Sequence, residues 1–208
     1  MAPVSATTDK MVRLEAARQD TRERILTEAE RLFRHYGYSK TTVADIAQAL
    51  SMSSANVYRF FGSKSEIVEA MAERMLGAKE SAAREIARLP LPASQRLRMI
   101  VSASHQNTVE TLIGETKVHE MVVVAMEEQW QVIQPHLNRM VEIFETLIKD
   151  GIAAGEFRSV DPHRAALCVH QAFTSQVHPQ IVVQCRRDPG SYANLDEMVD
   201  FVLAALKA

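Results

Sequence analysis

The chain has 208 residues, of which 47% are hydrophobic and 24% charged, a balance typical of soluble globular proteins. Its length suffices for one sizeable domain or two small ones, and its two cysteines exclude a disulfide-stabilised secreted scaffold. We find neither a signal peptide nor an apolar run of about eighteen residues, so we expect a cytoplasmic protein with no membrane partner. Seven glycines and seven prolines are too few for an all-β fold.

The net charge of −2 is unevenly distributed along the chain. Residues 21–64 carry seven basic and four acidic residues, which gives +3, whereas residues 89–208 carry ten and fourteen, which gives −4. A basic first part and an acidic remainder indicate that the two parts have different roles.

The first part of the chain is predicted to be a short helical domain behind an N-terminal arm. Residues 1–9 are small and polar and are expected to be disordered, while residues 10–19 can extend the first helix. Asp20, Thr42 and Ser53 are the predicted N-caps, because each is followed by apolar residues at helical spacing. The predicted helices are 20–37, 42–50, 53–61 and 64–88.

The second part is predicted to be helical as well. Asp161 with Pro162, and Asn194 with Glu197, mark two helix starts. Pro135 either kinks a helix or marks where it restarts, and Pro179 is expected to end one. The predicted helices are 97–112, 121–126, 130–155, 162–177 and 195–206. We therefore predict an all-α fold with an arm at 1–19, a helix-turn-helix domain at 20–64 and a helical domain at 65–208, joined by the long helix 64–88.

The three short helices predict a helix-turn-helix, in which the second helix of the pair enters the major groove of DNA. Asparagine and arginine side chains can read adenine and guanine, and hydroxyl groups can bind phosphates. Lys64, at the start of a helix, is placed to bind a phosphate, and Thr41 and Thr42 occupy the equivalent place on the preceding helix. The outer face of helix 53–61 presents Ser53, Ser54, Asn56, Tyr58 and Arg59.

Residues 21–76 resemble the DNA-binding domain of the TetR family of bacterial transcription regulators. The resemblance lies in residues 25–38, 41–47, 53–61 and 63–66. Two positions depart from the family pattern, because Ser51 stands where glycine is usual and Ser54 where lysine is common. By this resemblance, operator DNA is contacted by Thr42, Ser54, Ala55, Asn56, Tyr58, Arg59 and Lys64.

The resemblance also implies a helical C-terminal domain that dimerises through its last two helices and encloses a small-molecule pocket. The residues themselves agree, because a helix with more than one apolar face must bury the second, for example against a second copy. The alternative is that these residues pack inside one subunit. The predicted dimer contacts are Ala166, Val169, Phe173, Val177, Val199, Val202 and Leu206.

The pocket candidates are polar or polarisable residues on apolar faces, each of which can instead be an ordinary core residue. They are His105, Met121, Met126, Trp130, Phe144 and His170. The expected effector is an unidentified small molecule, with no other cofactor.

A different reading is a helical metal-binding protein or an enzyme that uses the C-terminal histidines and cysteines. No histidine pair at i, i+4 and no C-x-x-C motif is present, and we find no nucleophile elbow, phosphate loop or carboxylate motif. We therefore expect no metal site and no catalytic residues. The conceivable ligands, for completeness, are His105, His119, His163, His170, His178, Cys168 and Cys185.

Taken together, the sequence predicts a homodimeric repressor that binds a near-palindromic double-stranded DNA operator and is released by a small molecule. Its two recognition helices would have to lie roughly 34–36 Å apart, one turn of DNA. Helix 64–88 is the expected lever between the effector and the DNA.

Overall fold

The computed structural model describes residues 4–112, 124, 131–187, 190 and 192–208. Within these residues the fold is all-α, as predicted, and the only β-type feature is an isolated bridge between Phe157 and Lys207. The chain forms two compact units, Met1–Met71 and Ala72–Ala208.

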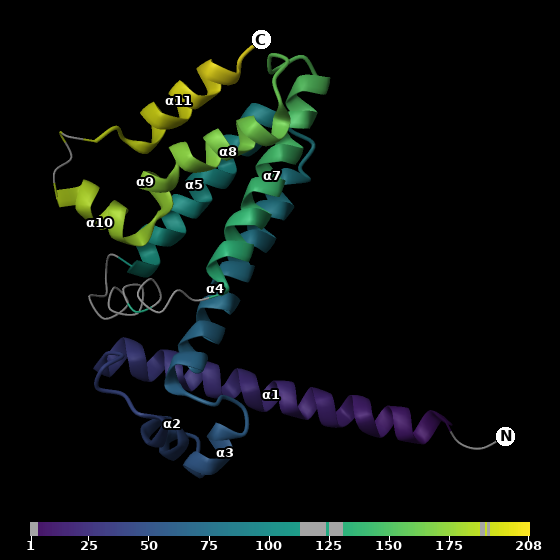
Figure 1. Cartoon of the computed structure of the whole chain (residues 1–208), viewed down its shortest axis with the longest axis vertical. Coiled ribbons are helices and arrows are strands. Elements are labelled where there is room, and N and C mark those ends of the chain that lie inside the picture. Colours follow the sequence, from purple (N-terminus) through teal and green to yellow (C-terminus); the bar gives the residue numbers. More distant parts are fainter. Residues whose placement is uncertain (1–3, 113–123, 125–130, 188–189, 191) are drawn as a thin grey trace. The chain divides into compact units, whose positions relative to one another are not determined.

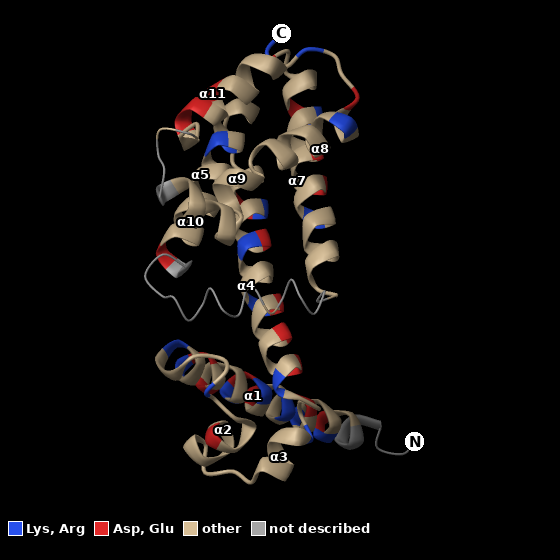
Figure 2. Ribbon diagram, turned by 60° about the vertical axis from the view of Figure 1, so that its left-hand side comes forward, with Lys and Arg blue, Asp and Glu red and all other residues tan. Residues whose placement is uncertain are grey.

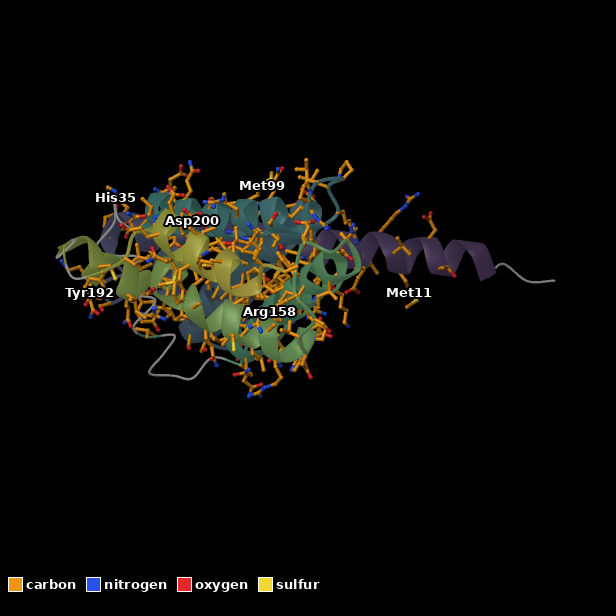
Figure 3. All side chains as sticks on the ribbon, turned by 90° about the horizontal axis from the view of Figure 1, so that it is seen from above. Met11, His35, Met99, Arg158, Tyr192 and Asp200 are labelled. Carbon is orange, nitrogen blue, oxygen red and sulfur yellow. The ribbon has the colours of Figure 1, made fainter. Side chains whose placement is uncertain are left out.

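The N-terminal unit consists of α1 (Val4–Tyr36), α2 (Val43–Ala49), α3 (Ser54–Tyr58) and the first turns of α4 (Lys64–Ala87) (Figure 1). Helix α1 begins at Val4, so the predicted N-cap at Asp20 is wrong, and residues 4–9 are helical where disorder was expected. No glycine or proline lies between Val4 and Tyr36 to end the helix. Residues 8–20 of α1 are all exposed, and Met11 projects from this stretch (Figure 3).

The starts of α2 and α3 follow the sequence prediction. The Thr42 hydroxyl accepts a hydrogen bond from the Asp45 backbone N–H, and the Asp45 carboxylate accepts one from the Thr42 N–H at 2.8 Å. The Ser53 hydroxyl caps α3 by accepting from the Asn56 N–H. Such caps satisfy backbone N–H groups that lack a partner inside the helix. The core of this unit contains Ile25, Leu26, Ala29, Leu32, Phe33, Val43, Ile46, Val57, Phe61, Ile67 and Val68.

The turn between α2 and α3 contains Ser51, whose φ of +56° is the only positive value at a non-glycine position among the described residues. An L-amino acid in this region costs about 1 kcal/mol, which glycine avoids. Ser51→Gly should therefore raise the free energy of unfolding of the N-terminal unit by about 0.5–1 kcal/mol, measured by urea denaturation. Ser39→Gly, in a neighbouring turn without positive φ, is the matched control and should not stabilise. A less stable Ser51→Gly protein would contradict this assignment.

The C-terminal unit contains the rest of α4, α5 (Ala93–Leu112), α7 (Ile133–Ala153), α8 (Pro162–Ala172), α9 (Thr174–Val177), α10 (Pro179–Arg187) and α11 (Leu195–Leu206). Helix α7 packs against α8 and α5, and α11 packs against α5 and α8 (Figure 1). Pro135 lies in the first turn of α7 and so belongs to a helix start.

As predicted, the helix before Pro179 ends ahead of it, with Val177 as the last residue of α9, but Pro179 is also the first residue of a further helix, α10. Proline is well tolerated at a helix start, where its missing N–H would have no partner in any case. The chain therefore breaks between α9 and α10 and continues as a helix that the sequence did not predict.

The loop after α7 caps α5 from a distant part of the chain. The Glu156 carboxylate accepts hydrogen bonds from the backbone N–H of Ala93 at 2.8 Å and of Ser94 at 3.1 Å. Gly151 makes room for the ring of Phe157, because a Cβ there would lie 2.2 Å from the ring. The buried core of this unit includes Leu97, Ile100, Val101, Met140, Phe144, Leu147 and Ile148.

Candidate functional site

Helix α3 presents a polar face to solvent. Ser53, Ala55, Tyr58 and Arg59 are exposed, Tyr58 by 50%, and Ser54 and Asn56 are half-buried. Val57 and Phe61 are buried on the opposite side. The helix therefore offers hydroxyl, amide and guanidinium groups of the kinds that read bases and phosphates.

The two threonines before α2 have different environments. Thr42 is exposed, and its hydroxyl lies 2.7 Å from the Asp45 carboxylate. Thr41 is only 1% exposed, and its hydroxyl donates to the Gly37 carbonyl oxygen at 2.9 Å. The predicted DNA contact through the Thr41 side chain is therefore corrected: this hydroxyl satisfies a carbonyl of the loop between α1 and α2, since buried polar groups need partners.

Lys64 is half-buried and bonded inward. Its ammonium group donates to the carbonyl oxygens of Tyr38 at 2.9 Å and Thr41 at 3.1 Å, and lies 4.1 Å from the centre of the Tyr38 ring. Burial lowers the pKa of Lys64. The side chain thus joins the start of α4 to the loop before α2, a structural role in addition to the predicted phosphate contact.

Arg22 has a similar bracing role that the sequence did not reveal. Its guanidinium donates to the Phe60 carbonyl oxygen at 3.1 Å and lies 4.2 Å from the centre of the Phe61 ring. It ties α1 to the residues just after α3. The only sign of this role in the sequence is the position of Arg22 on the inner side of α1, one turn before Ile25 and Leu26.

The basic charge of this unit is less available than the residue count suggests. Lysines and arginines lie along α1 and at the start of α4 (Figure 2). Arg31 and Arg34 pair with Glu28 and Glu30 on the same helix. Among the residues that the structure describes, the exposed basic side chains without an ion pair between positions 21 and 64 are those of Arg24, Lys40 and Arg59.

The residues predicted as dimer contacts are inside the chain, which is a correction. Six are buried and belong to the core of the C-terminal unit, where they pack between α7, α8 and α11. Val177 is half-buried. Their apolar faces are already covered by the same chain, so they leave no surface for a second copy. The six are Ala166, Val169, Phe173, Val199, Val202 and Leu206.

The opposite faces of α8 and α11 are exposed. Phe201 on α11 is 73% exposed, more than any other large hydrophobic residue described. Ala204 and Ala205 lie beside it, one turn further along α11, and are also exposed. On α8 the exposed stripe is formed by Arg164, Cys168 and Gln171, which lie one turn apart. We call these residues the α8–α11 face.

Ion pairs hold the edge of α11 that lies next to this face. Arg98 on α5 pairs with Asp196 and Asp200 on α11. Figure 3 shows Asp200 and Met99 on these neighbouring helices. The two ion pairs hold α11 against α5 and leave Phe201 turned away from the core.

Three of the pocket candidates lie among the described residues. Phe144 is buried, and its ring centre lies 6.5 Å from that of His170, which is half-buried. His105 is half-buried, and its Nδ1 lies 2.5 Å from the Gln176 carbonyl oxygen. Met121, Met126 and Trp130 lie outside the described residues.

The C-terminal unit also buries an ionic network that the sequence did not predict. The Glu80 carboxylate on α4 accepts hydrogen bonds from His136 Nδ1 at 2.7 Å and Arg139 Nε at 2.6 Å, both on α7. Burial alone would raise the pKa of Glu80, but these two hydrogen bonds outweigh it and the pKa is lowered. Glu80 therefore joins α4 to α7 as a carboxylate.

Three half-buried imidazoles make the stability of this unit pH-dependent. Burial lowers the pKa of His136, His170 and His178 from the ordinary value of 6.5. Below pH 6.5 the unfolded chain therefore binds protons that the folded protein still excludes. The free energy of unfolding should be level above about pH 7.5 and should fall as the pH drops from 6.5 to 5, in urea titrations at each pH. His170→Asn should reduce this slope, and a stability that rises on acidification would refute the assignment.

Metal-binding side chains do not assemble in the described part of the chain. No group of three or more His, Cys, Asp or Glu residues there could hold a metal ion. Cys168 is exposed and Cys185 half-buried, and both are free thiols. None of the described helices is both long and apolar enough to span a bilayer.

Two family models match the chain. Residues 25–71 match the model described as bacterial regulatory proteins, tetR family. Residues 93–199 match the model of the tetracyclin repressor-like C-terminal domain. Together the matches include most of both units.

Known proteins give a consistent picture. The chain is 23% identical over 164 residues to YhgD of Bacillus subtilis, an uncharacterized HTH-type transcriptional regulator, and the match covers 76% of this chain and 83% of YhgD. It is 37% identical over 57 residues to the HTH-type transcriptional regulator TtgR of Pseudomonas putida, 27% of either chain. These 57 residues correspond to about a quarter of each protein.

Solved structures share the fold. SmeT, the repressor of the Stenotrophomonas maltophilia multidrug efflux pump SmeDEF, has a TM-score of 0.65 at 21% identity, with 90% of each chain covered. A TetR/AcrR family regulator from Thermobifida fusca has a TM-score of 0.65 at 22% identity, over 89% of this chain and 95% of that one. Both likenesses extend through the C-terminal unit.

Proposed function

Since the chain belongs to the TetR family of bacterial transcription regulators, we propose that it is a repressor that binds a near-palindromic operator as a homodimer and leaves it when a small molecule binds the C-terminal unit. The α8–α11 face is the proposed contact between the two copies. Two copies related by a twofold axis would present two α3 helices to successive major grooves, roughly 34–36 Å apart.

The outward face of α3 is the observation that carries the proposal. Ser53, Tyr58 and Arg59 are exposed while Val57 anchors the helix in the core. A short helix of this kind, held from behind by α1 and α2, is a rigid support for groups that read DNA. The family to which the chain belongs and the exposed face of α3 support the same role.

A gel-shift experiment on the DNA that flanks the protein's own gene tests the proposal. We expect a specific shift that competitor DNA does not remove. Its affinity should fall steeply with salt concentration, because phosphate contacts release counterions. If no flanking fragment gave a specific, salt-sensitive shift, the proposed repressor function would be wrong.

Arg59 and Lys64 should differ in how they affect DNA binding. Arg59→Ala should lower operator affinity by about 10- to 100-fold and relax the sequence preference, since this exposed guanidinium on α3 is placed to read a base. Lys64→Ala should weaken binding to all sequences about equally. It should also lower stability, because the ammonium holds the loop before α2.

Binding curves on operator and on random DNA, together with thermal unfolding, separate the two effects. The matched control is Arg31→Ala, because Arg31 is exposed but already paired with Glu28. If Arg59→Ala and Lys64→Ala both kept wild-type binding, the α3 face would not be the DNA contact.

Helix α4 is the proposed lever of the response. It crosses the boundary between the two units at residues 71 and 72. A small molecule that favours one position of α4 would change operator affinity by the coupling free energy, about 1–3 kcal/mol or roughly 5- to 150-fold. A complex of the structurally similar SmeT with triclosan is known, and we propose that the effector of this protein is also a small molecule, bound in the C-terminal unit.

A further inference from the structure

Lys79 on α4 is a cation inside the C-terminal unit that has no acidic partner among the described residues. Its Nζ lies 3.3 Å from the hydroxyl oxygen of Thr108 on α5. The neighbouring carboxylate of Glu80 is turned to α7, where His136 and Arg139 occupy it. Burial lowers the pKa of Lys79. An ammonium group held in this way is costly to the folded protein, which makes it a candidate for function.

The break between α9 and α10 adds further polar groups beside Lys79. Thr108 donates to the Val177 carbonyl oxygen at 3.0 Å, so the hydroxyl joins α5 to the end of α9. His105, one turn earlier on α5, is bonded to the Gln176 carbonyl oxygen. His178, at the break itself, has a buried Nδ1 without a hydrogen-bond partner among the described residues. Lys79, His105, Thr108 and His178 form what we call the Lys79 patch.

The charge of the patch selects for an anion. His178 has a pKa lowered by burial and is neutral at pH 7, as are His136 and His170 on the helices that pack nearby. The positive charge of Arg139 is balanced by Glu80. Among the described residues of the patch, the ammonium of Lys79 is therefore the remaining charge, and the unpartnered imidazole of His178 can donate a hydrogen bond to a negative group.

The surroundings of the patch are apolar. Along α5, Val101 lies one turn before His105 and belongs to the buried core. Along α7, Met140 and Phe144 follow His136 at intervals of one turn and are buried as well. These side chains are packed in the core, so a ligand with one charged group at Lys79 would have to displace hydrophobic side chains with its remaining atoms.

We propose that the effector of this protein is an organic acid with an apolar body, and that its carboxylate pairs with Lys79 at the Lys79 patch. This inference rests on the proposed function as a ligand-responsive repressor, because it names the chemistry of the effector. The acid supplies the counter-ion that Lys79 lacks among the described residues, and the imidazole of His178 supplies a hydrogen bond to the same group.

The first experiment needs no ligand. In the protein without ligand, Lys79→Met should raise the unfolding temperature, because it removes a buried charge and keeps the length of the side chain. Lys149→Met, at an exposed lysine paired with Glu145, is the matched control and should leave it unchanged. A lower unfolding temperature for Lys79→Met would show that an acidic residue of the chain already pairs with Lys79, and this would overturn the proposal.

The second experiment measures binding by calorimetry with octanoate and 1-naphthoate, and with their uncharged analogues 1-octanol and 1-naphthamide. At least one carboxylate should bind the wild-type protein at least tenfold more tightly than its analogue. Lys79→Met should lose this preference, and Lys149→Met should keep it. Equal binding of acid and uncharged analogue, absence of binding by both acids at millimolar concentration, or unchanged acid binding by Lys79→Met would each overturn the proposal.

The two experiments are independent of DNA. If the wild-type protein without ligand does not bind the operator, the proposed repressor function is wrong. If the calorimetry does not give the expected result, the proposed pairing of the effector with Lys79 is wrong, whether or not the protein binds the operator. Unliganded Lys79→Met should bind the operator as the wild-type protein does, while the carboxylate that binds should release only the wild-type protein from it.

Discussion

Replacing Phe201 by glutamate should convert the protein into a monomer and lower its operator affinity by about 100-fold or more. Phe201 is 73% exposed on α11, and large aromatic residues with such exposure are typical of interface centres. Burial of a carboxylate there in both copies would cost several kcal/mol in lost hydration. A monomer keeps only one α3 helix and therefore contacts only half of a palindromic site.

Sedimentation and gel-shift measurements on the same protein samples test this result. Tyr192→Glu, an equally drastic change at an exposed residue outside the α8–α11 face, should leave both the assembly and the operator affinity unchanged. A Phe201→Glu protein that remained dimeric and bound the operator normally would refute the α8–α11 face as the contact between copies.

The fold of the N-terminal unit could be predicted well from the sequence because its signals are local. Thr42 and Ser53 cap α2 and α3 through residues three positions away, and Val57 and Phe61 face inward by helical spacing. The prediction that Thr41 contacts DNA was wrong because its hydroxyl is buried and donates a hydrogen bond to the Gly37 carbonyl oxygen in the loop. Such a partner becomes visible only when the loop is folded.

The C-terminal unit was predicted less completely because its arrangement depends on long-range contacts. The spacing of apolar residues showed that α8 and α11 have wide apolar faces. It did not show whether the core of the same chain or a second copy covers each face. Val169 and Val199 turned out to be core, while Phe201 lies outside. Pairing of Glu80 with Arg139, fifty-nine positions apart, had no sequence signal. The helix end before Pro179 was predicted, but the helix that begins at Pro179 was not, since proline suits both positions.

Glu80→Ala should have the largest effect on stability among these variants, a loss of about 1–3 kcal/mol in the free energy of unfolding of the C-terminal unit. The Glu80 carboxylate is the shared acceptor for His136 and Arg139. Its removal leaves a half-buried guanidinium and a buried imidazole donor without their partner, which costs more than the loss of the bonds themselves. The link between α4 and α7 would be lost with it.

Chemical denaturation followed by circular dichroism at pH 7 measures this loss, and Glu85→Ala, at an exposed glutamate on the same helix, should change stability by less than about 0.5 kcal/mol. Glu80→Gln keeps an acceptor oxygen and should lose less than Glu80→Ala. In the double variant with Arg139→Ala the two losses should not add, since both changes break the same contact. Additive losses, or a Glu80→Ala protein as stable as the wild type, would mean that the network does not hold α4 to α7.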